Sequence, residues 1–160
     1  MEFSISAKQT EMAEGIVRFC RQELNGDVPR RDREESFDGV LFRKCGDVGL
    51  AGLPIPADSG GSGLDSLSTA LLLEAFGYGC RDGGLVFSLC AHLCACAVPL
   101  WTFGSAAQRQ RHLAPLAAGR CIGANAASES EAGSDCFAMK TRADKDGDGY
   151  RISGVKSFVT

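Results

Sequence analysis

The chain has 160 residues, a length that supports one substantial hydrophobic core and one or two domains. Its hydrophobic content of 44% is ordinary for a globular protein, and a net charge of -3 without a basic stripe argues against nucleic acid as a partner. The N-terminus lacks the basic stretch and apolar run of a secretory signal, so we expect a soluble cytoplasmic protein.

The first residues show apolar side chains at helical spacing. This pattern predicts a helix over residues 5–24, with Ser4 or Ser6 as its cap. A second helical stripe covers residues 37–45 and is entered through Ser36.

A charged segment separates these two helices. Arg30, Arg31 and Arg33 alternate with acidic residues, so their charges cancel. A charge run of this kind is typical of a solvated surface, and we expect a solvated loop there.

Residues 49–63 are rich in glycine and proline and predict a loop, after which the helical pattern resumes over 67–78. The most apolar stretch, 83–103, contains His92 and fits a buried helix over about 84–103 better than a membrane span. No membrane span is therefore expected.

A further helix follows with its own start and stop signals. Ser105 can cap it, Gln108 completes a capping box, and Gly119 can end it. We therefore expect an all-helical domain over residues 1–119.

Three of the eight cysteines, Cys90, Cys94 and Cys96, lie in the apolar stretch, where cysteine acts as a small hydrophobe. Their spacing is not a zinc pattern, so we expect buried free thiols and no metal site. We interpret His92 as a hydrogen-bonded core residue and His112 as part of a polar helical face. Neither has the neighbours that a catalytic dyad needs.

The hydrophobic period changes near Arg120. Residues 121–127 are small and apolar, and residues 138–143, 150–153 and 156–160 have the pattern of strands. The most natural hairpin turn lies at 145–149. A helical block followed by strands indicates an α+β order, and a sheet that begins without a closing strand predicts that the chain is part of a longer one.

The acidic turn at Asp144–Gly149 has the opening pattern of a calcium-binding EF-hand loop. That loop needs a bidentate carboxylate at its twelfth position, where this chain has Val155. We therefore reject a calcium site.

Residues 123–135 carry the chemistry of the chain. Small side chains let a flat ligand approach the backbone, Ser128, Ser130 and Ser134 supply hydroxyls, and Gly133 can turn backbone amides inward. Such a loop can hold a phosphate or the polar edge of a planar heterocycle. From the residues alone, an ordinary surface loop explains the segment equally well.

At this segment the chain resembles the acyl-CoA dehydrogenase family. Residues 123–135 are similar to the family's flavin loop, and 150–160 to its second signature, Tyr-x-Leu-Asn-Gly-x-Lys-x-Trp-Ile-Thr. Residues 60–65, 101–105 and 108–116 also agree, in the family's order and spacing.

The resemblance implies an all-helical N-terminal domain over 1–119, followed over 120–160 by the start of a β-barrel-like flavin domain, without the C-terminal helical bundle. It also implies FAD as cofactor, a homo-oligomer, and α,β-dehydrogenation of an acyl thioester, with hydride passing to flavin N5. The electron acceptor is not implied.

Carried over by position, the resemblance assigns roles to particular residues. Ser128 would lie at the pyrimidine edge of the flavin, Ser134 near the cofactor phosphates and the substrate, and Phe158 against the ring, with Thr160 near N5. The expected cofactor-binding residues are Asn125, Ala127, Ser128, Gly133, Ser134, Phe158, Val159 and Thr160.

Three positions depart from the family pattern. Ser128 replaces threonine, Ser130 replaces proline, and Phe158 replaces tryptophan. Together they suggest a divergent branch with an unusual substrate, which is an acyl thioester of coenzyme A or of an acyl carrier protein. One hypothesis is a polyketide-associated member that acts on a short, polar acyl group held by a carrier protein.

The family's catalytic base is a glutamate of the C-terminal domain, so no catalytic residue is assigned in this chain. One alternative is a binding or assembly module that kept the fold and lost the chemistry. An oxidase or a monooxygenase on the same fold is the other.

Overall fold

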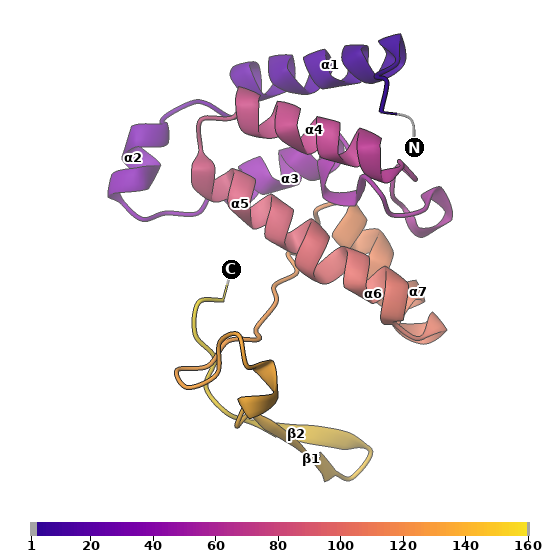
Figure 1. Ribbon diagram of the computed structural model, residues 1–160. Helices are drawn as coiled ribbons and strands as arrows, with labels where there is room; N and C mark the ends of the chain where they lie inside the picture. Colours follow the sequence, from indigo (N-terminus) through magenta and orange to yellow (C-terminus); the bar gives the residue numbers. More distant parts are fainter. Residues whose placement is uncertain (1–2, 160) are drawn as a thin grey trace. The chain divides into compact units, whose positions relative to one another are not determined.

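The structure is a computed structural model that describes residues 3–159. The chain divides into two compact units, one ending at Gly123 and the other beginning at Ala124 (Figure 1). The division lies slightly beyond the boundary expected after residue 119. The first unit is helical and the second contains both strands, which confirms the predicted fold class.

The helical unit is built from α-helices joined by short 3₁₀ turns, with one π-helical segment. Its elements are α1 (Ala7–Glu23), α2 (Val28–Arg33), α3 (Gly39–Asp47), η1 (Leu50–Gly52), η2 (Ala57–Ser59), α4 (Ser66–Gly79), α5 (Gly83–His92), η3 (Leu93–Ala97, the π-helix), α6 (Val98–Phe103) and α7 (Ala106–Ala117).

Side-chain caps set the starts of several helices. Ser6 begins α1 with a complete capping box, as Ser105 does for α7. Helices α1 and α4 pack side by side (Figure 1), and Gln9 Nε2 donates to Ser68 Oγ at 2.9 Å between them. The cap of α3 is Asp38 and not the predicted Ser36, because the Asp38 carboxylate accepts from two amides of the first turn.

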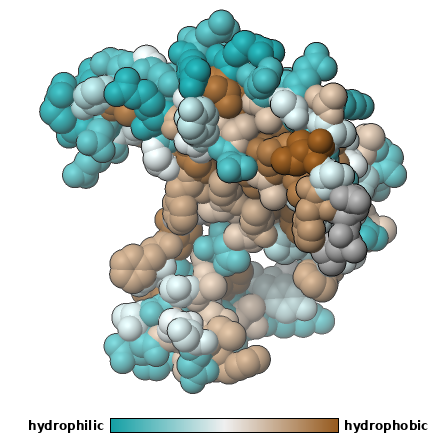
Figure 2. Space-filling model, turned by 45° about the horizontal axis from the view of Figure 1, so that its top comes forward, coloured by the Kyte–Doolittle hydropathy of each residue, from teal (hydrophilic) through white to brown (hydrophobic). Residues whose placement is uncertain are grey.

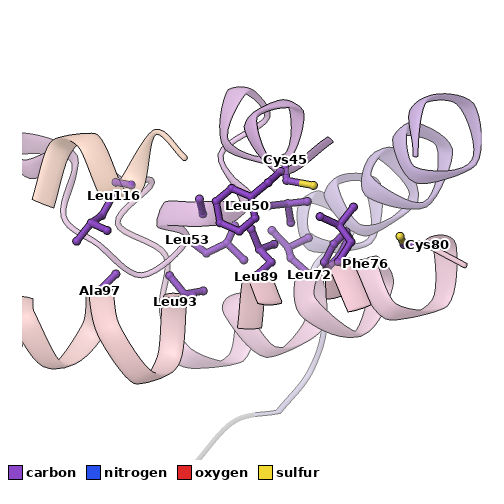
Figure 3. Close-up of a cluster of buried hydrophobic side chains, with 14 of the residues drawn as sticks. Cys45, Leu50, Leu53, Leu72, Phe76, Cys80, Leu89, Leu93, Ala97 and Leu116 are labelled. Atoms are coloured by element: carbon purple, nitrogen blue, oxygen red, sulfur yellow. The ribbon is translucent and has the colours of Figure 1, made fainter. Parts of the chain in front are cut away.

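One hydrophobic core unites these helices (Figure 3). Phe42, Phe76 and Leu89 are fully buried in it, and burial of each such side chain stabilises the fold by roughly 1.5–3 kcal/mol. The core residues labelled in Figure 3 are Cys45, Leu50, Leu53, Leu72, Phe76, Cys80, Leu89, Leu93, Ala97 and Leu116.

The predicted apolar helix forms as the continuous run of α5, η3 and α6, but it is buried along one face only. Leu85, Leu89 and Leu93 enter the core, whereas Phe87 is 62% exposed and Phe103 is 86% exposed. Among residues 3–159, Gly83–Phe103 is the one helix long and apolar enough to cross a membrane. Brown, apolar areas are visible on the molecular surface in Figure 2.

The prediction of buried thiols in this helix is wrong for Cys94, which is exposed, while Cys90 and Cys96 are partly buried. Cys94 lies on the face that points away from the core. Helical periodicity alone could not separate the two faces, because the stretch is apolar on every side.

The charged segment at residues 30–35 is not simply a solvated loop. It contains α2, and Arg31 is buried where Arg30 is exposed. The Arg31 guanidinium reaches Asp82 Oδ2 at 3.0 Å from Nη2 and also donates to the carbonyls of Leu24 and Gly26. Asp82 in turn caps α5 through the amide of Leu85.

The second unit contains η4 (Cys136–Ala138), β1 (Arg142–Asp146) and β2 (Gly149–Ser153). The strands pair antiparallel, with Asp146 opposite Gly149. Gly147 has φ 61° at the first central position of the two-residue turn, as a type II′ turn requires. The acidic segment Asp144–Gly149 is therefore a hairpin, with its turn at 147–148 between two strands.

Two strand predictions are wrong. Residues 138–141 are not strand, so β1 begins later than predicted, and residues 156–159 form an irregular segment instead of a strand. The apolar alternation of 156–159 resembles that of a strand, but none of the described residues of this unit pairs with it as a ladder. Thr160 lies outside the described residues.

Replacement of Arg31 by alanine should destabilise the protein by roughly 3 kcal/mol, because it leaves the poorly exposed Asp82 without its cation. Arg30→Ala is the matched control: its side chain is exposed, and the substitution should leave stability nearly unchanged. Urea unfolding followed by circular dichroism measures both, and equal midpoints would contradict the structural role of Arg31.

Candidate functional site

The two segments expected to hold the flavin lie together within the second unit. The amide of Ser157 donates to the carbonyl of Ser128 at 2.9 Å. Lys156 Nζ donates to the carbonyl of Ala127 at 3.0 Å. The loop and the segment before residue 160 are therefore joined at their backbones, as two sides of one site must be.

Glu129 is the centre of this junction. Its carboxylate accepts from the amides of Lys140 and Thr141, at 2.7 and 2.9 Å, and from Lys156 Nζ at 2.9 Å. Hydrogen bonding from Thr141, followed by that from Lys140 and Lys156, lowers the pKa of Glu129 to about 2. Glu129 thus remains ionised and links the loop to the two residues before β1 and to Lys156, three residues beyond the end of β2.

The loop closes on itself directly after Glu129. The backbone groups of Glu129 and Ala132 exchange two hydrogen bonds, of 2.9 and 3.2 Å, around Ser130 and Glu131. Ala132 is buried beneath the turn. Ser130, which stands where the family has proline, occupies the first central position of this turn, the position that proline favours.

Phe158 combines two unusual properties. Its φ of 56° lies in the left-handed region, which a bulky side chain rarely adopts, and its ring is 95% exposed. Backbone strain of this kind corresponds to roughly 1–3 kcal/mol and is concentrated at functional sites. An exposed aromatic ring on a strained backbone is compatible with the face-packing role expected of it.

The other predicted site residues are accessible to a ligand. Ser128 is partly buried, and the exposed residues are Asn125, Ala127, Gly133, Ser134 and Val159. Their roles toward FAD and substrate stay predictions. The hydroxyls of Ser128 and Ser134 suit the polar edge of a flavin, and the exposed ring of Phe158 suits its face. Both kinds of group lie in the same compact unit of the chain.

Sequence reasoning missed the positioning residues. Glu129 and Lys156 lie within the two motifs, but no role was assigned to either of them. The sequence did contain a hint of their ion pair, because one motif of the expected site has an acidic residue and the other has a basic residue.

The two histidines occupy the environments that the sequence indicated. His92 is fully buried, and both of its ring nitrogens are within hydrogen-bonding distance of backbone groups. His112 lies exposed on α7.

The helical unit has a separate pocket of about 750 Å³ between α2, α3 and the start of α5. Arg31 and Asp82 line it, but these two side chains are already paired with each other. Asp32, Glu35 and Arg81 also line it, so the pocket carries charged groups of both signs.

Comparison with known proteins identifies the family. Residues 6–120 match the family described as "Acyl-CoA dehydrogenase, N-terminal domain", which is more than half of the chain. The chain belongs to this family, as its motifs and fold indicated.

The relatives include proteins that act on carrier-bound substrates. An L-prolyl-(peptidyl-carrier protein) dehydrogenase from Serratia sp. is 42% identical over 160 residues, covering 100% of this chain and 42% of that protein. A protein of the same name from Pseudomonas fluorescens is 43% identical, covering 99% of this chain and 42% of that protein. The chain thus spans about 42% of the length of these curated relatives.

Solved structures agree over the same part. The structure entitled "PigA with FAD and proline" matches with a TM-score of 0.91 at 42% identity, over 99% of this chain and 42% of that chain. The prolyl acyl carrier protein oxidase AnaB matches with a TM-score of 0.93 at 42% identity, over 98% and 41%.

Replacement of Ser130 by proline should raise the free energy of unfolding by about 0.4–1 kcal/mol, because proline restricts the unfolded chain to backbone angles that suit this turn. The two hydrogen bonds of the turn join Glu129 and Ala132, so neither needs the amide that proline lacks. Urea unfolding measures the change, with Ser130→Ala as the control for loss of the hydroxyl. A destabilised proline variant would show that the turn geometry is wrong.

Glu129 should make stability dependent on acid pH. Its pKa is lowered from 4.5 to about 2 in the folded protein. As the pH falls, Glu129 is therefore protonated in the unfolded chain before it is protonated in the folded one. The stability that ionised Glu129 contributes is lost as the pH falls from about 4.5 toward 2. Unfolding free energies measured across this interval should fall less steeply in Glu129→Gln than in the natural protein. Glu131→Gln controls for the change in net charge, and an unchanged slope in Glu129→Gln would contradict the network.

Proposed function

We propose that the natural polypeptide containing this chain is a FAD-dependent dehydrogenase that forms an α,β double bond in an acyl thioester held by a carrier protein. The observation that carries the proposal is the junction of the two signature segments through Ser128, Ser157 and Lys156. Family membership and the carrier-protein relatives support it.

The flavin, when bound, supplies the two-electron acceptor for the oxidation. The chain's own residues position that acceptor. Ser128 would offer its hydroxyl to the polar edge of the ring, Phe158 would cover one face, and Ser134 would lie toward the phosphates and substrate. Glu129 and Lys156 would act indirectly, by fixing the backbone on which these groups stand.

The carboxylates of the loop are not suited to remove the α-proton. Glu129 is committed to several donors and has a pKa of about 2, far below the value that suits a general base near neutral pH. The base would come from elsewhere in the polypeptide, where the family resemblance places a glutamate.

We propose a prolyl or similarly small aminoacyl group on a peptidyl carrier protein as substrate. Two relatives at 42% and 43% identity bear names with this substrate, and they match the chain along nearly its whole length. The three departures from the common family motif suggested a short, polar, carrier-bound acyl group independently. We also propose a cytoplasmic homo-oligomer, as the family resemblance implies.

A second candidate differs only in the electron acceptor. One structural relative is named an oxidase, whereas the two curated relatives are named dehydrogenases. In an oxidase the reduced flavin would be reoxidised by oxygen, and the positions of the chain's residues would be the same.

The complete natural polypeptide should be yellow and should bleach anaerobically when mixed with prolyl-carrier protein. The bleaching rate with this substrate should exceed the rate with prolyl-coenzyme A and with butyryl-coenzyme A. A colourless protein that cannot be reconstituted with FAD would favour the non-catalytic module, and faster bleaching by either coenzyme A thioester would overturn the carrier-protein proposal. Rapid return of colour on admitting air would identify the oxidase.

A further inference from the structure

His92 bonds to two backbone groups that are distant from it in sequence. Its Nε2 lies 3.1 Å from the carbonyl of Leu116, near the end of α7, and its Nδ1 accepts from the amide of Gly123 at 2.8 Å. The ring is fully buried and meets the ring of Phe42 edge-on, with 5.3 Å between centroids.

These two bonds determine the tautomer. A backbone amide can only donate, so Nδ1 must carry no proton and must accept from Gly123. The single proton of the neutral ring then lies on Nε2, which donates to the carbonyl of Leu116. Burial lowers the pKa of His92, which keeps the imidazole neutral at physiological pH.

Gly123 is held on its other side by the π-helix. A Cβ added to Gly123 would lie 2.3 Å from Cys96 Sγ and 2.8 Å from Cys96 Cβ, so the backbone there lies directly against η3. Extra-residue turns of this kind are frequent at functional sites. Contact with Cys96 and the bond to His92 together fix one residue, and that residue is the last before the expected flavin-binding segment.

We propose that neutral His92 is a positioning residue for the flavin-binding segment: by accepting from the Gly123 amide it fixes the point from which residues 124–135 depart. The inference rests on the proposed function, because its consequence is tighter binding of FAD. The Leu116 bond has a different role, which is to close α7 onto α5 within the helical core.

The two bonds can be separated by two substitutions in the complete natural polypeptide. In His92→Asn the amide oxygen can replace Nδ1 as acceptor for Gly123, whereas in His92→Gln the amide nitrogen can replace Nε2 as donor to Leu116. Each variant keeps one bond and loses the other. Phe42→Leu, which perturbs the same part of the core and leaves both bonds in place, is the control for general destabilisation.

FAD dissociation constants, from titration of the apoprotein, are compared with unfolding midpoints. His92→Gln should weaken FAD binding about tenfold, because binding must then also order the segment that starts at the unpaired Gly123 amide, while His92→Asn and Phe42→Leu should stay near the natural value. If FAD binding weakens equally in all three variants and follows their unfolding midpoints, His92 contributes only to the stability of the core and the inference is wrong. Unchanged binding in His92→Gln would also overturn the inference.

The tautomer gives a readout that does not depend on FAD or on the variants. Nitrogen-15 chemical shifts of the His92 ring in the natural protein should show a bare Nδ1 and a protonated Nε2, and a proton on Nδ1 would overturn the inference. If the natural protein binds no FAD, the proposed function and this inference both fall. If it binds FAD and the variants do not differ, only this inference falls.

Discussion

Among the described residues of the strand unit, one ionised carboxylate joins three segments of the chain. Every residue of β1 and β2 is exposed, so the hairpin contributes almost no hydrophobic stabilisation within the described residues. Glu129 instead gathers two amides and the Lys156 ammonium around a largely buried side chain. Charge-assisted hydrogen bonds are roughly twice as strong as neutral ones, so this polar centre is a strong link between these segments.

The helical unit is stabilised by the opposite means. Its core is continuous from α1 to α7, and the two large polar side chains buried at its edge, Arg31 and His92, are hydrogen-bonded. Arg31 donates hydrogen bonds to Asp82 and to two backbone carbonyls, and His92 is hydrogen-bonded to two backbone groups. Such buried polar groups contribute less to stability than to the choice of one arrangement, since any other packing would leave them unpaired. The end of the helical unit at Gly123 is specified in this way.

Much of the fold could be predicted from the sequence, because helical spacing and capping boxes are local signals. Ser105 with Gln108 gave the start of α7, Ser6 was one of the two caps expected for α1, and the turn at 145–149 marked the hairpin. The failures concern information that is not local. Cys94 and Phe87 belong to an apolar helix whose two faces have the same composition, and Arg31 looks like its exposed neighbours until Asp82 is placed beside it. For the site, the motifs located the two segments, but only the structure revealed Glu129 and Lys156 as the groups that join them.

At position 158 the backbone conformation and the predicted role of the side chain favour different residues. Glycine or asparagine would relax the left-handed backbone there, yet either would delete the exposed ring. A laboratory selection for heat resistance alone would therefore enrich small residues at this position and discard the aromatic surface.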